Sequence, residues 1–418
     1  MTPRPNSPRV AVIGAGAAGT MAAIFAAAGG ADTVLLERTR DGGRKILISG
    51  GGRCNVLPAR LDESRFISDS SPNTLRKIVR SWPLAEQVDF FQGDLGIPLV
   101  EEPESAKLFP ASNRARDVRD GLLEHARHRG ARVLTDTRVT DVLPEGTAWS
   151  IRRDGADPLV VDAVIIATGG LSVPNTGSEG FGLRLATQLG HTVHSTYAAL
   201  TPLAADPAPF GELSGVSLPV TLTATSKARS ATASGGFLFT HHGYSGPSVL
   251  NVSHVAVRSR GTADPARVRV RWTTADDDAV ETLLRPSGTR TVLGALRTML
   301  PDRLAAVLLQ RCDVPAARTL SELTRDERRR VMEGLLRGEL PWTGDEGYRK
   351  AEVTGGGVSL AEIDPLTMES RRHPGLFLCG EVLDAFGPIG GYNFLWAWAT
   401  GRAAGHGAAR HGAARHGA

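Results

Sequence analysis

The feature that most constrains this chain is a glycine turn between a short apolar strand and a helix near the N-terminus. Residues 10–13 (Val-Ala-Val-Ile) predict a buried strand, and Gly14-x-Gly16-x-x-Gly19 opens an Ala-rich helix that ends near Ala28. Gly14 permits the tight turn, Gly16 lets a pyrophosphate approach the backbone, and Gly19 allows close packing of helix and strand. Free N–H groups and the helix dipole favour phosphate binding there. The sequence therefore predicts a dinucleotide-binding βαβ unit.

An acidic residue stands where such a unit needs one. Residues 33–36 predict the second strand, and Glu37 ends it, about 20 residues beyond the turn. A carboxylate at this place accepts hydrogen bonds from both hydroxyls of an adenosine ribose and repels a 2′-phosphate. The motif alone fits either FAD or NAD.

A second glycine loop follows at once. It comprises Gly42-Gly43-Arg44-Lys45 and Ser49-Gly-Gly-Gly-Arg-Cys-Asn55. Successive glycine N–H groups form anion nests, and the basic side chains add positive charge. The loop favours a long ligand with two phosphates over a mobile surface segment, and thus FAD over NAD.

The C-terminal part carries a third glycine-rich turn. Gly380-Glu381 follows a predicted strand at 376–379, and Gly390-Gly391-Tyr392-Asn393 leads into a helix at 392–404. Free N–H groups at this helix start would stabilise negative charge on a reduced flavin ring. The alternative is an ordinary helix cap with tight backbone packing.

Pattern changes along the chain predict five segments. Residues 132–151 predict a hairpin, residues 161–167 a strand, and residues 216–225 and 267–273 two further strands. The segments are a first part of an FAD-binding domain (1–191), a β-rich insert (192–276), a helical subdomain (277–342), a return to the FAD-binding domain (343–405) and a disordered tail (406–418) with a His-Gly-Ala-Ala-Arg repeat.

Composition excludes several classes. The formal net charge is only +4 and no long Lys/Arg run occurs, so we expect no nucleic-acid partner and no membrane partner. No apolar run is long enough to span a bilayer, and the N-terminus does not resemble a signal peptide. The three Cys form no C-x-x-C, which indicates a cytoplasmic protein without a metal site.

In combination, the motifs resemble the bacterial BaiN/YhiN-like flavoproteins, also described as the aminoacetone oxidase family or as NAD(P)/FAD-dependent oxidoreductases. Besides the three glycine turns, the resemblance rests on Ala167-Thr-Gly-Gly170, Pro174-Asn-Thr-Gly-Ser-Glu-Gly-Phe-Gly182 and Phe239-Thr-His-His-Gly-Tyr-Ser-Gly-Pro247. It implies an α/β fold with a Rossmann-like FAD-binding domain, interrupted by a β-barrel-like insert with a small helical subdomain. The segment 104–110 departs from the family pattern, because Ala106-Lys107 replaces a small residue followed by Arg.

The resemblance also implies the residues that hold non-covalent FAD. They are Gly14, Ala15, Gly16, Ala17, Ala18 and Gly19 at the pyrophosphate; Glu37 and Arg38 at the ribose; Arg44, Lys45, Ser49, Gly50, Gly51, Arg53, Cys54 and Asn55 along the cofactor; Val139 at the adenine; Thr168 and Gly169 near the dinucleotide; and Gly380, Glu381, Gly391, Tyr392, Asn393 and Phe394 near the flavin.

The predicted function is an FAD-dependent oxidoreductase that transfers a hydride between a small organic substrate and the flavin. A second nucleotide-binding turn is absent from the sequence, so NAD(P)H as electron donor would have to reach the flavin directly. His241, His242 and Tyr244 are weak candidates for catalysis, and structural roles are equally compatible with them. Two alternatives remain: an NAD-dependent dehydrogenase, and a non-catalytic flavin-binding or regulatory protein.

Overall fold

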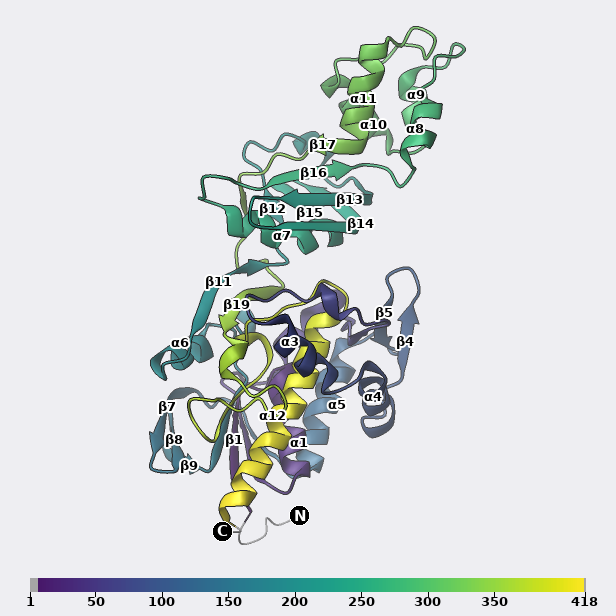
Figure 1. The fold of residues 1–418 in the computed structure, drawn as a ribbon. Helices are drawn as coiled ribbons and strands as arrows, with labels where there is room; N and C mark the ends of the chain where they lie inside the picture. The colour runs from purple at the N-terminus through teal and green to yellow at the C-terminus, as the bar shows by residue number, and fades with distance from the viewer. Residues whose placement is uncertain (1–6, 417–418) are drawn as a thin grey trace. The chain divides into compact units, whose positions relative to one another are not determined.

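The computed structural model describes residues 7–416 and divides the chain into two compact units (Figure 1). The discontinuous unit combines the residues up to Thr196 with those from Val353 onward, and the inserted unit comprises Tyr197–Glu352. Each unit has its own hydrophobic core.

A five-stranded parallel sheet forms the centre of the discontinuous unit. Its strands in spatial order are β20 (Leu376–Leu378), β10 (Ala163–Ile166), β1 (Arg9–Ile13), β2 (Asp32–Leu36) and β6 (Arg132–Leu134). Four of the five residues of β1 and all of β10 are buried, which explains their continuous apolar sequences. The predicted strands at 10–13 and 33–36 are thereby confirmed, and the strand predicted at 161–167 is confirmed for residues 163–166, whereas Val161 ends β9.

Helices and two small antiparallel sheets surround the central sheet. The helices are α1 (Ala17–Ala28), α2 (Arg44–Ile48), α3 (Pro72–Arg80), α4 (Leu84–Asp89), α5 (Ala115–His128), α6 (Phe181–Gln188) and α12 (Tyr392–His416). The small sheets are β3 (Leu57–Pro58), β5 (Lys107–Pro110) and β4 (Leu99–Glu102), and β7 (Val139–Glu145), β8 (Ala148–Arg153) and β9 (Ala156–Val161); β11 (Val193–Ala199) pairs with β19 (Val353–Val358).

Small residues let α1 and α12 approach each other closely. A Cβ built on Gly401 would lie 2.4 Å from the Ala18 carbonyl oxygen, and one on Gly405 would lie 2.4 Å from that of Ala22. No larger residue fits at either glycine. This contact explains why both helices are rich in Ala and Gly.

The prediction of a disordered tail at 406–418 is wrong for residues 406–416, because these residues belong to α12. α12 continues through the His-Gly-Ala-Ala-Arg repeat to His416, with Ala408 fully buried; residues 417–418 lie outside the described residues. The His411 ring lies 2.9 Å from the Glu369 carboxylate. The repeat is a stripe of small residues that extends a packed helix.

The predicted hairpin at 132–151 also differs from the structure. Residues 132–134 form the edge strand β6 of the parallel sheet, and the antiparallel pairing begins only at Val139, where β7, β8 and β9 form a meander. Both stretches are short and contain Val and Leu, so the sequence pattern does not separate them.

The inserted unit contains a seven-stranded sheet. Its strands in order are β17 (Gly338–Glu339), β16 (Arg267–Arg271), β13 (Ser217–Thr225), β14 (Ser230–Thr240), β15 (Gly243–Ser245), β12 (Leu203–Ala204) and β18 (Gly344–Asp345). Among the described residues no pairing closes this sheet into a barrel. The unit's helices are α7 (Pro247–Ser259), which packs on β13 and β14, and α8 (Asp277–Leu283), α9 (Val292–Leu296), α10 (Asp302–Arg311) and α11 (Arg325–Arg337).

Candidate functional site

The first glycine turn has the geometry of a nucleotide-binding loop. Gly14 has a φ of +102° and its N–H donates to the Leu36 carbonyl oxygen at 2.8 Å. A Cβ on Gly19 would lie 1.8 Å from the Gly14 carbonyl oxygen, so this position is closed to any side chain. A Cβ on Gly16 would meet nothing within 4 Å, so the backbone there faces open space at the N-terminus of α1.

Glu37 joins this turn to the end of β2. One of its carboxylate oxygens accepts from the Ala15 N–H at 2.8 Å, and the other accepts from the Thr39 N–H and hydroxyl at 2.8 and 2.7 Å. The side chain is buried. The carboxylate is therefore held rigidly beside the turn, where a ribose acceptor is expected.

The second glycine loop is strained and partly open. Gly50 and Gly51 both have positive φ, and a Cβ on Gly51 would meet nothing within 4 Å. Cys54 adopts a φ of +62° although it is not a glycine, which marks a conformation that the surroundings enforce. The next residue, Asn55, has a buried side-chain carbonyl oxygen (Oδ1) without a hydrogen-bond partner among the described residues. Because such orphaned acceptors are rare, it indicates a missing donor.

The basic residues predicted near the phosphates are paired with carboxylates. Arg44 lies 2.8 Å from Asp41, and Arg38 forms an ion pair with Glu179. Arg53 contacts Glu102 at 2.9 Å, and its guanidinium carbon lies 4.1 Å from the centre of the Phe109 ring.

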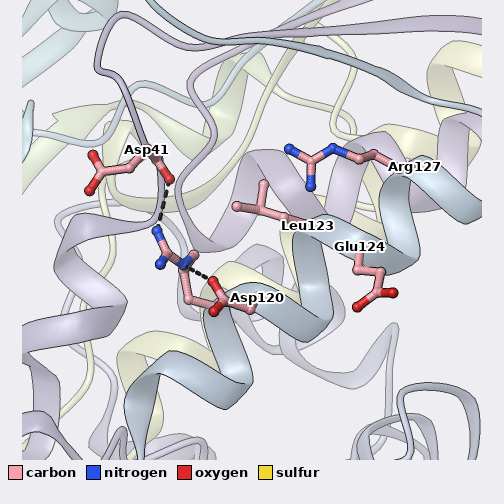
Figure 2. A pocket seen from close by; sticks show the side chains of 6 residues that line it. Asp41, Asp120, Leu123, Glu124 and Arg127 are labelled. Carbon is pink, nitrogen blue, oxygen red and sulfur yellow. Dashed lines mark hydrogen bonds and ion pairs between the residues drawn. The ribbon is translucent and has the colours of Figure 1, made fainter.

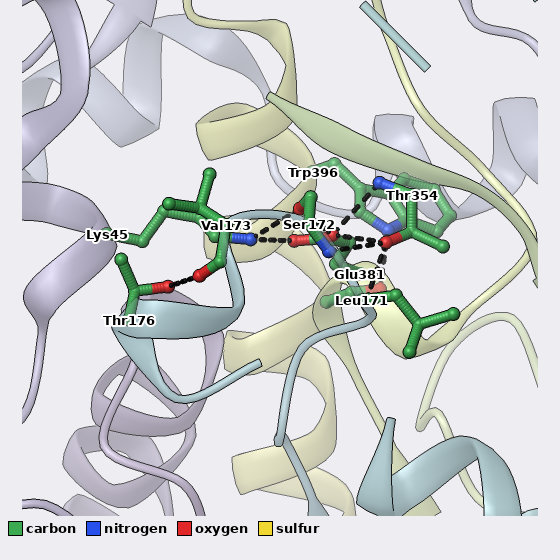
Figure 3. A network of polar contacts seen from close by, with 9 residues as sticks. Lys45, Leu171, Ser172, Val173, Thr176, Thr354, Glu381 and Trp396 are labelled. Carbon is green, nitrogen blue, oxygen red and sulfur yellow. Dashed lines mark hydrogen bonds and ion pairs between the residues drawn. The ribbon is translucent and has the colours of Figure 1, made fainter. Parts of the chain in front are cut away.

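A partly buried network connects four segments that lie far apart in the sequence (Figure 3). The Lys45 ammonium donates to Glu381 Oε2 and to the Ser172 hydroxyl, both at 2.7 Å. Glu381 Oε1 accepts from the Ser172 hydroxyl at 2.5 Å and from the Thr354 N–H and hydroxyl at 3.0 and 2.8 Å. Thr354 Oγ1 in turn accepts from the N–H groups of Leu171 and Ser172. The network therefore fixes α2, the loop after β10, β19 and the turn after β20 to one another.

Electrostatics keep Glu381 ionised in this network. Burial alone would raise the pKa of the Glu381 carboxyl, but the Lys45 ammonium and the Ser172 and Thr354 hydrogen bonds outweigh burial and hold that pKa below its ordinary value.

The C-terminal glycine turn is closely packed against β3. A Cβ on Gly391 would lie 2.3 Å from the Leu57 carbonyl carbon. The Asn393 side chain exchanges two hydrogen bonds with the Gly387 backbone, at 2.9 and 3.0 Å, and the Tyr392 hydroxyl accepts from the Asp62 N–H at 3.2 Å. Phe394 stacks on Trp398. These contacts hold the N-terminus of α12 in place, as a binding site for a planar ligand requires.

Of the other predicted cofactor residues, Gly380 and Thr168 lie beside the first glycine turn. Gly380 donates to the Thr400 hydroxyl, and the Thr168 hydroxyl accepts from the Gly182 N–H. Gly169 has a positive φ, and Val139 begins β7. Burial raises the pKa of the Cys54 thiol to about 12, so this cysteine is a poor nucleophile toward a flavin.

Together these residues fit an FAD molecule. Open backbone at Gly16 and Gly51 gives space beside N–H groups, Glu37 offers a carboxylate to a ribose, and Asn55 has an unused acceptor. The loops at 14–19, 49–55 and 391–394 would hold the cofactor. Among residues 7–416 no group of three or more His, Cys, Asp or Glu side chains is placed to bind a metal.

The catalytic candidates lie in the inserted unit. His241 and His242 are exposed in the turn between β14 and β15. Tyr244 is only 1% exposed and packs among Phe237, Phe239 and Phe210, and burial raises the pKa of its hydroxyl, which has no partner among the described residues. Tyr244 is therefore a core residue, which favours the structural role over proton donation to a substrate.

Sequence reasoning missed a buried arginine beneath the second glycine loop. Arg119 on α5 donates to the carbonyl oxygens of Asp41 and Gly42 at 3.0 and 3.5 Å and forms an ion pair with Asp120. A surface groove beside it is lined by Asp41, Arg119, Asp120, Leu123, Glu124 and Arg127 (Figure 2). Arginine is common in amphipathic helices, so its presence in α5 does not predict hydrogen bonds to the glycine loop.

The roles of Ser172 and Thr354 were not predicted from the sequence either, nor were the hydrogen bonds by which Asp384 holds the loop at 68–70. Asp384 accepts from the Ser68 and Ser70 hydroxyls and from the Asp69 N–H, all at 2.9 Å. A threonine inside the otherwise apolar, Gly-rich segment 353–358 was the available signal for Thr354.

Comparisons with known proteins extend over almost the whole chain. The model of the HI0933-like protein Rossmann domain matches residues 8–407. A 3-dehydro-bile acid delta(4,6)-reductase of Clostridium scindens is 31% identical over 408 residues, which cover 96% of this chain and 98% of the relative. A ribosomal RNA dihydrouridine synthase of Escherichia coli is 31% identical over 399 residues, 94% of this chain and 96% of the relative.

Solved structures share the fold at low identity. A 3-ketosteroid delta1-dehydrogenase from Sterolibacterium denitrificans aligns with a TM-score of 0.52 and 13% identity, covering 97% of this chain and 100% of that chain. The E. coli quinol fumarate reductase subunit FrdA aligns with a TM-score of 0.51 and 15% identity, covering 98% of this chain and 71% of that chain. No helix among residues 7–416 combines the length and apolar character of a bilayer-spanning segment. With its glycine turns in place and the family model matched from residue 8 to residue 407, the chain belongs to the HI0933-like family of FAD-binding oxidoreductases.

Proposed function

We propose that the protein is a flavin-dependent reductase that saturates a carbon–carbon double bond conjugated to a carbonyl group. The observation that carries this proposal is the shared chemistry in the names of two relatives that match along nearly their full length. A delta(4,6)-reductase of a 3-dehydro bile acid and a dihydrouridine synthase both saturate such a bond, in an unsaturated ketone and in a uracil ring. The sequence predicted a small organic substrate, and we propose that this substrate is a conjugated carbonyl compound.

The chain's own residues bind and orient the reactants in this proposal. Bound FAD, once reduced, supplies a hydride for the carbon β to the carbonyl, and a proton adds to the α carbon. The glycine turn and the N-terminus of α1 hold the pyrophosphate, and Glu37 holds the ribose. The first N–H groups of α12, from Gly391 to Asn393, would stabilise negative charge on the flavin ring.

We further propose that NADH or NADPH supplies the electrons, binding directly against the flavin because the sequence has one nucleotide-binding turn. A reducing cytoplasm is the proposed location. All three cysteines are buried free thiols, which supports a compartment that does not oxidise them.

Two anaerobic half-reactions test the proposal. Adding NADPH or NADH to the FAD-loaded protein should bleach the flavin absorbance, and 2-cyclohexen-1-one added afterwards should restore it, whereas saturated cyclohexanone should not. Flavin that stays oxidised with both nicotinamides would contradict the proposed donor and support an enzyme reduced by its own substrate or a regulatory flavoprotein. Equal reoxidation by both ketones would contradict the proposed reaction. Extraction of NAD in place of FAD would favour the dehydrogenase alternative.

A further inference from the structure

The outer face of the inserted sheet carries a regular array of polar side chains. Its three rows run across β16, β13 and β14, and each row contains an arginine followed by two hydroxyl residues. The rows are Arg267, Thr225 and Ser230; Arg269, Thr223 and Thr232; and Arg271, Thr221 and Ser234. We call these nine residues the arginine face. The residues between them in the strands, such as Val268, Val270, Leu222 and Ala224, point into the core.

The hydroxyl groups of the arginine face form a ladder. Thr221 and Ser234 lie 2.8 Å apart, Thr223 and Thr232 3.0 Å, and Thr225 and Ser230 3.2 Å, measured between their oxygens. Each pair uses one proton for the bond between its members, so each pair keeps one further proton to donate. The face therefore offers donors in fixed positions between the arginines and the edge of β14.

Two of the three arginines form no ion pair among the described residues. Arg271 contacts Asp277 at 2.6 Å, whereas Arg267 and Arg269 are exposed and form no ion pair or side-chain hydrogen bond among the described residues. Glu339 on β17 stands opposite Arg269 without an ion pair, and Lys227 and Arg229 add positive charge in the turn between β13 and β14. The face is thus basic, and alternate arginines on a strand lie about 6.5 Å apart.

We propose that the arginine face binds the sugar–phosphate backbone of an RNA that carries the reducible uracil base. This inference rests on the proposed function, because uracil has a double bond conjugated to a carbonyl group. Arginine pairs with phosphate through two N–H groups, and threonine and serine hydroxyls bond to phosphate and ribose oxygens. Two relatives named ribosomal RNA dihydrouridine synthases match more than nine-tenths of this chain. The nine residues include no aromatic or aliphatic side chain that would anchor the face in a lipid surface.

An RNA partner would depart from the prediction, drawn from the low net charge, that nucleic acid is no partner. Net charge averages over the whole chain, whereas the arginine face concentrates three guanidinium groups on one side of one strand.

A binding measurement with a matched control tests the arginine face. The probe is a fluorescein-labelled 20-nucleotide oligouridylate, followed by anisotropy across a salt series. We expect the double variant Arg267→Gln/Arg269→Gln to bind at least about 10-fold more weakly than the wild type, with a salt slope reduced by about 1.4, since each lost phosphate contact removes about 0.7. The control Arg285→Gln/Arg325→Gln removes the same charge from exposed positions elsewhere in the inserted unit and should retain wild-type binding.

The outcomes separate the surface from the reaction. Equal weakening in both double variants, or no binding by the wild type, would overturn the arginine face. Competition by phosphatidylserine vesicles as strong as by unlabelled oligouridylate would also overturn it, in favour of a general anionic surface. Reoxidation of the reduced flavin by 2-cyclohexen-1-one should be the same in both variants. If this reoxidation fails in all proteins while the binding pattern holds, the proposed reaction fails and the RNA surface stands.

Discussion

The two units of the chain use polar side chains in opposite ways. The discontinuous unit turns them inward: the buried Glu37 and the partly buried Lys45–Glu381 pair lie inside hydrogen-bond networks that join segments far apart in sequence. The inserted unit buries aromatic rings around Trp272 and Tyr244 and turns an ordered polar face outward.

This difference indicates which unit carries a preformed ligand site. Buried charges are costly unless they are fully paired, so a fold retains them where they position something else. A polar face in water costs little and remains open to a partner. Substitutions in the discontinuous unit should therefore affect cofactor binding and stability together, whereas those on the outer face of the inserted unit should affect binding alone.

The largest expected effect tests the open side of the first glycine turn. Gly16→Asp should weaken FAD binding at least about 100-fold, because a carboxylate would stand where the pyrophosphate binds. Gly16 has a φ of −79° and a Cβ placed there would have free space around it, so the variant should still fold. Equilibrium titration with FAD measures the change. Gly93→Asp, at an exposed glycine with similar free space, is the control; equal FAD affinity in both variants would remove the turn from the site.

The next largest effect is expected at the ion pair between Lys45 and Glu381. Glu381→Gln should lower the free energy of unfolding by about 2 kcal/mol, because the partly buried Lys45 ammonium loses its carboxylate partner. Glu102→Gln, which breaks the more exposed pair with Arg53, should lower the free energy of unfolding by less. Urea denaturation of both variants makes the comparison. Equal losses of unfolding free energy in the two variants would mean that the Lys45–Glu381 pair stabilises the fold no more than the exposed Arg53–Glu102 pair.

The same pair predicts a pH dependence. Because the folded state holds the pKa of Glu381 below its ordinary value, the stabilisation is complete above an unfolded pKa of about 4.3 and is lost as the pH falls through the folded pKa. The stability gap between the wild type and Glu381→Gln should therefore narrow in acid. If the difference in unfolding free energy between the wild type and Glu381→Gln widened as the pH falls, the pKa of Glu381 in the folded state would have to lie above its ordinary value.

A smaller effect is expected at the ribose. Glu37→Ala should weaken FAD binding about 10-fold, since a neutral methyl group replaces the acceptor of the ribose hydroxyls. The protein should remain folded although it loses the hydrogen bonds to Ala15 and Thr39. The dissociation constant of FAD, combined with circular dichroism of the apoprotein, gives the result; an unchanged constant would place the ribose elsewhere.

The smallest effect is expected in the core of the inserted unit. Tyr244→Phe removes a buried hydroxyl that has no partner among the described residues, so stability should change by less than about 1 kcal/mol and the flavin should be reduced and reoxidised at wild-type rates. Tyr244→Ala, in contrast, should cost about 3–5 kcal/mol through the cavity it leaves. A 100-fold slower reoxidation of Tyr244→Phe would restore this tyrosine as a proton donor.

Local sequence predicted the parts of the fold that depend on short-range patterns. The strand, the glycine turn and the helix from residue 10 to residue 28 lie next to one another in sequence, and their spacing alone defines the geometry. The strands predicted at 216–225 and 267–273 also appear, as β13 and its neighbour β16, because apolar and polar residues alternate in them.

Long-range contacts account for what the sequence did not predict. The tail from residue 406 contains small residues that indicate disorder in isolation. Contacts with Phe25 of α1, and with Thr367, Phe377 and Pro8 elsewhere in the unit, hold them in a helix. The partners of Glu381 lie between 27 and 336 residues away from it in sequence, so no local pattern connects them. Likewise, the arginines of β16 became part of a single face only when the strand register was known.

The measurement that tests the account most directly is the visible absorbance spectrum of the purified protein, before and after titration with FAD. We predict flavin bands and saturation at one FAD per chain, with heat-released FAD identified as the bound nucleotide. A colourless protein that takes up no added FAD would contradict the assignment of the discontinuous unit as a flavin-binding unit.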